Sequence, residues 1–149
     1  MVITTVGQFR PSLGSRGLIE GPTGGVRPLG TVLLIEHRDE VFAPLERELR
    51  RIGRRVYRAS RSEDVMRIHI DTKIDMTLSN YELPDSSCWL TAAKLRMFDG
   101  TARIWLYTVR HTIRDRLWAA LLGIEKVVPY DGDLFDLSGR IAEMLSASR

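Results

Sequence analysis

The sequence predicts an α/β fold in which five strands and five helices alternate within one domain. Short apolar segments recur between residues 31 and 130, and each precedes a segment whose apolar residues have helical spacing. Such alternation is typical of an open parallel sheet with helices on both faces, joined by right-handed crossovers. The 149 residues, 44% hydrophobic and 28% charged, suffice to bury a core without metal or disulfide support.

The first half of the domain contains the clearest elements. Residues 31–35 form a near-continuous apolar run, the pattern of a parallel strand covered on both faces. The following helix ends at Gly53, and residues 55–59 are the second predicted strand. Apolar residues of that helix recur at three- and four-residue steps: Phe42, Leu45, Leu49 and Ile52.

The second helix is predicted to begin with a capping box. Ser60 stands three residues before Glu63, the spacing at which the two side chains cap a helix start reciprocally, and the helix is expected to run to about Ile68. After a buried strand at residues 74–79, Ser86 or Ser87 is expected to cap the third helix.

The remaining elements follow the same alternation. Residues 103–108 are the fourth strand, and a helix at 113–122 carries Leu117, Trp118 and Leu121 before Gly123 ends it. Residues 126–128 form a short fifth strand, and a final helix covers about 133–145. The apolar residues of that last helix are Leu134, Leu137, Ile141 and Leu145.

The ends of the chain and its composition limit the remaining choices. Residues 1–30, rich in glycine and proline, are predicted to be a flexible arm, residues 31–146 the folded domain and residues 147–149 a short tail. The single cysteine, Cys88, excludes an intrachain disulfide and a multi-cysteine zinc site. With no apolar run of about 18 residues and no signal-peptide core, a cytoplasmic location without membrane contact is expected.

The stretch from Asp75 to Asp85 reads Asp-Met-Thr-Leu-Ser-Asn-Tyr-Glu-Leu-Pro-Asp, a buried strand that leads into a Leu-Pro-Asp turn. It resembles the third strand and following loop of bacterial response-regulator receiver domains, proteins of two-component phosphorelay systems. The resemblance spans about residues 31–146 and implies a flavodoxin-like fold with strand order 2-1-3-4-5. The family's phosphorylated aspartate aligns with Asn80, whose neutral amide supplies neither a nucleophile nor a charge for a metal ion.

The resemblance also assigns the other positions of a degenerate phosphorylation pocket. Glu36 and His37 match the acidic pair that binds magnesium, and Thr108 matches a phosphate-binding threonine. Val128 or Tyr130 stands where the family has a lysine. Magnesium prefers oxygen ligands, so its binding is expected to be weak or absent. A transition-metal site at Glu36 and His37 is the rival reading, although no further histidine or cysteine stands nearby at ligand spacing.

Receivers transmit signals through the face formed by the fourth helix, fifth strand and fifth helix. By this resemblance Arg114, Arg116, Trp118 and Tyr130 are candidates for a partner-binding face, and the same face is a candidate homodimer contact. Arginine and aromatic side chains are favoured anchors in protein interfaces. Taken singly, each residue has a simpler interpretation, in which Trp118 packs in the core and the arginines lie on the solvated surface of the helix.

These observations favour an atypical receiver, or pseudo-receiver, that acts in signal transduction through phosphorylation-independent protein binding. Three alternatives stay open: a conventional phosphorelay receiver with an altered site, a small-ligand or nucleotide-binding domain, and a DNA-binding regulator. The last would use a basic cluster, namely Arg47, Arg50, Arg51, Arg54, Arg55, Arg58 and Arg61. Enzymatic activity is not expected, because Cys88 and the three histidines suggest no nucleophile and base pair.

Overall fold

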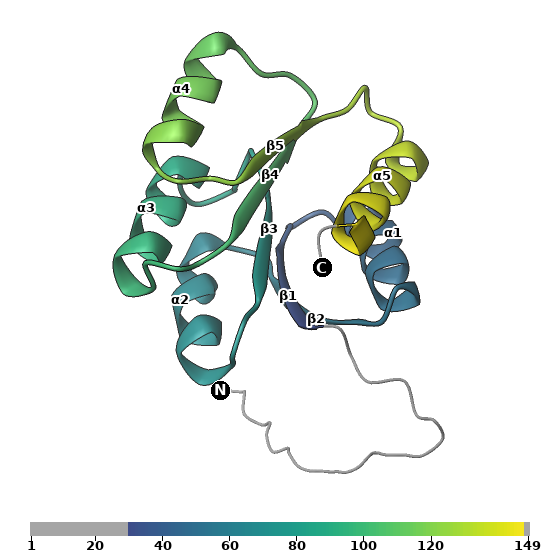
Figure 1. Cartoon of the computed structure of the whole chain (residues 1–149), viewed down its shortest axis with the longest axis horizontal. Coiled ribbons are helices and arrows are strands. Elements are labelled where there is room, and N and C mark those ends of the chain that lie inside the picture. The colour runs from purple at the N-terminus through teal and green to yellow at the C-terminus, as the bar shows by residue number, and fades with distance from the viewer. Residues whose placement is uncertain (1–29, 148–149) are drawn as a thin grey trace.

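The computed structural model describes residues 30–147 as a five-stranded parallel sheet between two layers of helices (Figure 1). The strand order is β2-β1-β3-β4-β5, as predicted. Helices α1 and α5 cover one face of the sheet, and α2, α3 and α4 cover the other. The elements are β1 (Gly30–Ile35), α1 (Asp39–Arg51), β2 (Arg54–Ala59), α2 (Ser62–Asp71), β3 (Met76–Asn80), α3 (Cys88–Phe98), β4 (Ile104–Thr108), α4 (Ile113–Leu121), β5 (Lys126–Pro129) and α5 (Leu134–Ala147).

The described residues cover only part of the predicted chain ends. Gly30, expected in the flexible arm, is the first residue of β1, and the rest of that predicted arm lies outside the described residues, as do residues 148–149. Within residues 30–147, no helix has the length and apolar character needed to cross a bilayer.

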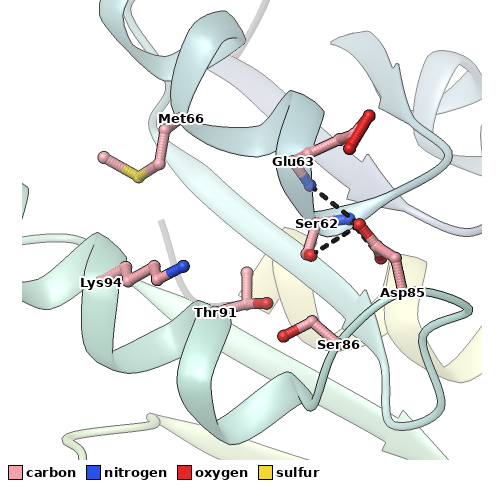
Figure 2. A pocket seen from close by; sticks show the side chains of 7 residues that line it. All are labelled: Ser62, Glu63, Met66, Asp85, Ser86, Thr91 and Lys94. Carbon is pink, nitrogen blue, oxygen red and sulfur yellow. Dashed lines mark hydrogen bonds between the residues drawn. The ribbon is translucent and has the colours of Figure 1, made fainter.

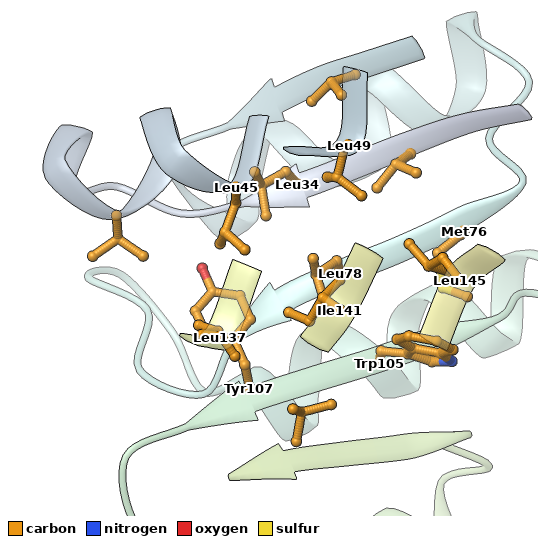
Figure 3. Close-up of a cluster of buried hydrophobic side chains, with 14 of the residues drawn as sticks. Leu34, Leu45, Leu49, Met76, Leu78, Trp105, Tyr107, Leu137, Ile141 and Leu145 are labelled. Carbon is orange, nitrogen blue, oxygen red and sulfur yellow. The ribbon is translucent and has the colours of Figure 1, made fainter. Parts of the chain in front are cut away.

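Alternation along the strands divides the core into two layers. Val32 and Leu34 of β1 face α1 and α5, whereas Leu33 and Ile35 face the opposite helices. Both sets are fully buried, which explains why the strand reads as an unbroken apolar run. Figure 3 shows the face of the sheet covered by α1 and α5, where the side chains of strands and helices pack together: Leu34, Leu45, Leu49, Leu78, Trp105, Ile141 and Leu145.

The predicted capping box at Ser60 is wrong. Arg61 is the N-cap of α2 and makes no side-chain cap, and Ser60 lies before it in a bend. Instead, the carboxylate of Asp85 accepts hydrogen bonds from the backbone N–H groups of Ser62 at 2.9 Å and Glu63 at 3.2 Å (Figure 2). The cap comes from the Leu-Pro-Asp turn after β3, more than twenty residues away, so local spacing does not reveal it.

Helix α4 is attached to the sheet by few side chains. Of its residues only Asp115 and Ala119 are buried. Asp115 forms a capping box with Thr112 and accepts a hydrogen bond from the Tyr81 hydroxyl at 2.9 Å. Leu117 and Leu121, two of the apolar residues of this predicted helix, are exposed, as is Met97 of α3. The inward face of α4 is therefore narrow and partly polar.

Replacing Asp85 by alanine is expected to lower the free energy of unfolding by about 1 kcal/mol, because two N–H groups at the start of α2 lose their acceptor. Burial alone would raise the pKa of the Asp85 carboxyl, but the hydrogen bonds from Ser62 and Glu63 together outweigh it and lower the pKa. The cap's stability is therefore present above about pH 4 and lost as pH falls through the folded-state pKa. Urea unfolding at pH 7 and pH 3 measures both effects.

Ser60→Ala is the matched control, since the rejected capping box would make Ser60 the cap. We expect its free energy of unfolding to stay within a few tenths of a kcal/mol of the wild type. A loss at Ser60 as large as that at Asp85 would contradict the assignment of the cap.

Candidate functional site

The carboxyl ends of three neighbouring strands bring the candidate site together. Glu36 directly follows β1, while Asn80 and Thr108 are the last residues of β3 and β4. Asn80 lies beside Tyr107 in the register of β3 and β4. Because side chains alternate along a strand, Asn80 and Tyr107 continue the rows of Leu78 and Trp105 toward α1 and α5.

The carboxylate of Glu36 is the centre of this site. Glu36 is completely buried. One of its oxygens, Oε1, accepts hydrogen bonds from Asn80 Nδ2 at 3.0 Å and from the Tyr107 hydroxyl. The other, Oε2, accepts from the backbone N–H of Arg38 at 2.8 Å and from Arg38 Nε at 3.1 Å. A carboxylate buried in this way persists because charged and neutral donors occupy its lone pairs.

Arg38 supplies the positive charge of the site. Its guanidinium approaches both carboxylate oxygens, with Nη2 at 3.4 Å from Oε1. Hydrogen bonding to Glu36 is the largest cause of a raised pKa for Arg38, and contact with Tyr130 adds to it. The arginine therefore stays charged and links the loop after β1 to the residue that follows β5.

Tyr107 lies entirely within the core and donates its hydroxyl to Glu36. Burial raises its pKa well above the ordinary value near 10, and the negative charge of Glu36 raises it further. The phenol is therefore a neutral donor at physiological pH.

Asn80 acts in this site as a hydrogen-bond donor and acceptor. Besides donating to Glu36, it accepts a bond from the backbone N–H of Glu82 at 3.1 Å through Oδ1. Both ends of the amide are thus engaged. An amide in this position has no nucleophilic oxygen comparable with a carboxylate.

The structure brings together some of the predicted pocket residues and not others. Glu36 and Asn80 are bonded directly, and Tyr130 is buried against Tyr107 with ring centroids 6.3 Å apart. His37 lies at the margin, with Nδ1 3.8 Å from Glu36 Oε2. Thr108 turns into its own loop, where its hydroxyl donates to the Arg110 carbonyl at 2.6 Å. Thr108 therefore uses its hydroxyl in the turn after β4.

Two residues of the network, Arg38 and Tyr107, were missed by sequence reasoning. Arg38 was assigned no role from the sequence, although a cation two residues after a buried acid is within reach of its carboxylate. Tyr107 was treated as strand core. The strand register that places it beside Asn80 would have identified it, because both side chains lie on the same face of the sheet.

The position of the family's lysine is apolar or aromatic. Val128 is buried in the core facing α1 and α5, and Tyr130 occupies the next position on that side. Lys126 lies at the opposite end of β5, with Nζ 5.6 Å from the centre of the Trp105 ring. No lysine of β5 therefore reaches the site in the described part of the chain.

The donor set does not fit a magnesium ion. Magnesium requires several oxygen ligands in octahedral geometry, whereas the carboxylate oxygens of Glu36 are already hydrogen-bonded and the neighbours are an amide, an imidazole and a guanidinium. Among residues 30–147, no group of three or more His, Cys, Asp or Glu residues is arranged to hold a metal ion. The same finding leaves the rival transition-metal reading without further ligands.

Cys88 is buried at the start of α3. Burial raises the pKa of its thiol to about 12, and the negative charge of Asp115 contributes. A thiol with this pKa is almost entirely protonated at neutral pH and is a poor nucleophile.

The candidate partner face differs from the prediction at one residue. Arg114, Arg116 and Trp118 are exposed on α4, but Tyr130 is buried and belongs to the pocket network. The missing signal was strand alternation, which directs Tyr130 toward Tyr107. The exposed face of α4 also contains an apolar row at four-residue spacing, with Ile113 78%, Leu117 62% and Leu121 77% exposed.

The basic cluster is largely paired within the molecule. Arg50 and Arg51 bind Glu46 and Glu48 on α1, and Arg58 binds Asp39 at 2.8 Å. Arg54 is buried and donates to the Leu145 carbonyl, and Arg61 approaches Glu63 at 3.7 Å. These intramolecular partners reduce the positive charge that the cluster offers to a phosphate backbone.

Tyr107→Phe is expected to reduce the free energy of unfolding at pH 7 by about 1–3 kcal/mol, because the buried carboxylate of Glu36 loses a donor. A raised folded-state pKa also implies stability that is complete below about pH 10 and lost as pH rises through the folded-state pKa. Thermal unfolding between pH 8 and pH 11 should therefore show a steeper alkaline decline for the wild type than for the variant.

Tyr57→Phe is the control, since Tyr57 is only partly buried and lies on the other face of the sheet. Equal alkaline slopes for wild type and Tyr107→Phe would contradict the inferred state of the Tyr107 phenol.

Comparison with known proteins places this geometry in a fold family. No protein-family model and no curated sequence matches the chain. Solved structures do match it. A LuxR-family two-component response regulator from Aurantimonas is 24% identical and has a TM-score of 0.68, with 80% of this chain and 87% of that chain covered. The non-phosphorylated HemR receiver domain from Leptospira biflexa is 19% identical with a TM-score of 0.70, covering 80% and 97%.

A third match is the response regulator TrrA from Thermotoga maritima, solved in complex with Mg(2+)-BeF. It is 18% identical with a TM-score of 0.65, and 78% of this chain and 99% of that chain are covered. The shared strand order, the two helical layers and these matches together show that the chain has the flavodoxin-like fold of response-regulator receiver domains.

Proposed function

We propose that this chain is a pseudo-receiver, a non-enzymatic cytoplasmic module that acts in signal transduction by binding a protein partner without being phosphorylated. One observation carries the proposal. The side chain at the position of the family's phospho-acceptor is the amide of Asn80, which is committed as a donor to Glu36.

The chemistry of phosphoryl transfer supports this reading. The reaction needs a nucleophile, a cation that neutralises the transferred group and a donor that stabilises it. Here the nucleophile is absent at position 80, the donor set does not fit magnesium, and the Thr108 hydroxyl is bound to the loop after β4. None of the three requirements of phosphoryl transfer is met, which favours a domain that acts through contacts of its surface with another protein.

The exposed face of α4 supports the choice of a protein partner. Ile113, Leu117 and Leu121 form an apolar row, and Arg114 and Arg116 add positive charge beside it. Exposed apolar rows of this kind mark sites of protein contact. The occupant that fits is an amphipathic segment of another protein with acidic residues flanking its apolar side chains. A second copy of this chain fits less well, since it would bring the same arginines to the contact.

Intact mass spectrometry after incubation with acetyl phosphate and magnesium tests the phosphorylation part of the proposal. We expect no phosphoryl adduct on the wild type, because Asn80 is not a nucleophile. The Asn80→Asp variant is measured in parallel, and an adduct confined to it would support the assignment of position 80. A stoichiometric adduct on the wild type would return the protein to the class of conventional phosphorelay receivers.

Site-specific photo-crosslinking in cells tests the partner surface. A benzophenone side chain placed at Leu117 should crosslink to one acidic protein, because Leu117 lies in the middle of the apolar row. The same group at Arg55, which is exposed on β2, is the control. Loss of the crosslinked species when Leu121 is changed to aspartate would confirm the row as the contact. Equal labelling from positions 117 and 55 would contradict it.

A further inference from the structure

The buried carboxylate of Glu36 requires a positive charge, and the described chain supplies that charge from within. Arg38 donates to Oε2 through both its backbone N–H and Nε, and its Nη2 approaches Oε1. Asn80 and Tyr107 complete the donors to Oε1. Neither carboxylate oxygen is left without a partner, so a metal ion would have to displace a bond that already exists.

Arg38 also lies between this carboxylate and solvent. Glu36 and Tyr107 are completely buried and Asn80 nearly so, whereas the Arg38 side chain is 37% exposed. Within this network, Arg38 is thus the member that an ion arriving from solvent meets first. The neighbouring cation Arg58 plays a different part, since it donates to the backbone carbonyl of Glu36 and pairs with Asp39.

We propose that the Arg38 guanidinium is the resident cation of this site and excludes divalent cations from Glu36. The site then holds its one charged acid without any ion from solution. This assignment is independent of whether α4 binds a partner. It predicts a latent cation site, opened when Arg38 is removed and a second carboxylate is provided at position 80.

Manganese binding to the full-length chain tests the proposal, because Mn²⁺ shares the preference of magnesium for oxygen ligands and can be counted by electron paramagnetic resonance. The proteins compared are the wild type, Arg38→Ala with Asn80→Asp, and Asn80→Asp with Arg110→Ala. Arg110 is the matched control, since it is an exposed arginine just beyond the end of β4 and contacts Thr108 through its backbone only.

We expect the Arg38→Ala, Asn80→Asp variant to bind one Mn²⁺ at least about tenfold more tightly than the wild type and the Arg110 control, because a cation no longer competes for the carboxylates. Circular dichroism establishes that each variant is folded, and Arg38→Gln replaces Arg38→Ala if the latter does not fold. Wild-type binding as tight as that of the double variant would overturn the proposal. So would equal affinities for the Arg38 and Arg110 double variants, or no gain in a folded Arg38 variant.

Discussion

The burial of one carboxylate, that of Glu36, constrains the whole carboxyl end of the sheet. An unpaired buried charge costs far more free energy than a typical domain has to spare. The bonds that satisfy Glu36 come from the loop after β1, from the end of β3 and from β4. Contact between Arg38 and Tyr130 extends the network to the loop after β5. The network therefore joins four segments at the carboxyl end of the sheet.

The amide at position 80 is consistent with this constraint. A carboxylate at that point would lie about 3 Å from Glu36, and two like charges at such a distance share one site only with a proton or a cation between them. With an amide, the same contact becomes a hydrogen bond. An amide at position 80 therefore lacks a nucleophilic oxygen and also avoids the repulsion between two carboxylates. With a carboxylate at position 80, a bound cation would be needed to relieve that repulsion.

The alternation of strands and helices was predictable from local pattern, the strand order from the resemblance to receiver domains, and the site only in part. The alternation of strands and helices, with buried apolar runs in β1 and β4, predicts the layered architecture. These signals depend only on residues close together in the chain, so the sequence alone reveals them. Glu36 and Asn80 were identified through the resemblance to receiver domains, and the structure places them at the ends of β1 and β3. Tyr107 and the Asp85 cap depend on contacts between segments far apart in the chain, so no local spacing reports them. Tyr130 was identified but assigned also to an exposed face, an error that its burial corrects.

Helix α4 shows why an amphipathic period alone does not reveal which side faces the core. Its apolar row points to solvent, and its buried side includes the polar Asp115, held by Thr112 and Tyr81. Molecules of the unbound protein are expected to associate through this apolar row, and the association increases with protein concentration. The adjacent arginines oppose this association through like-charge repulsion, and that repulsion weakens as salt is added. The solubility of the unbound protein is therefore expected to depend on ionic strength through the same surface that we assign to its partner.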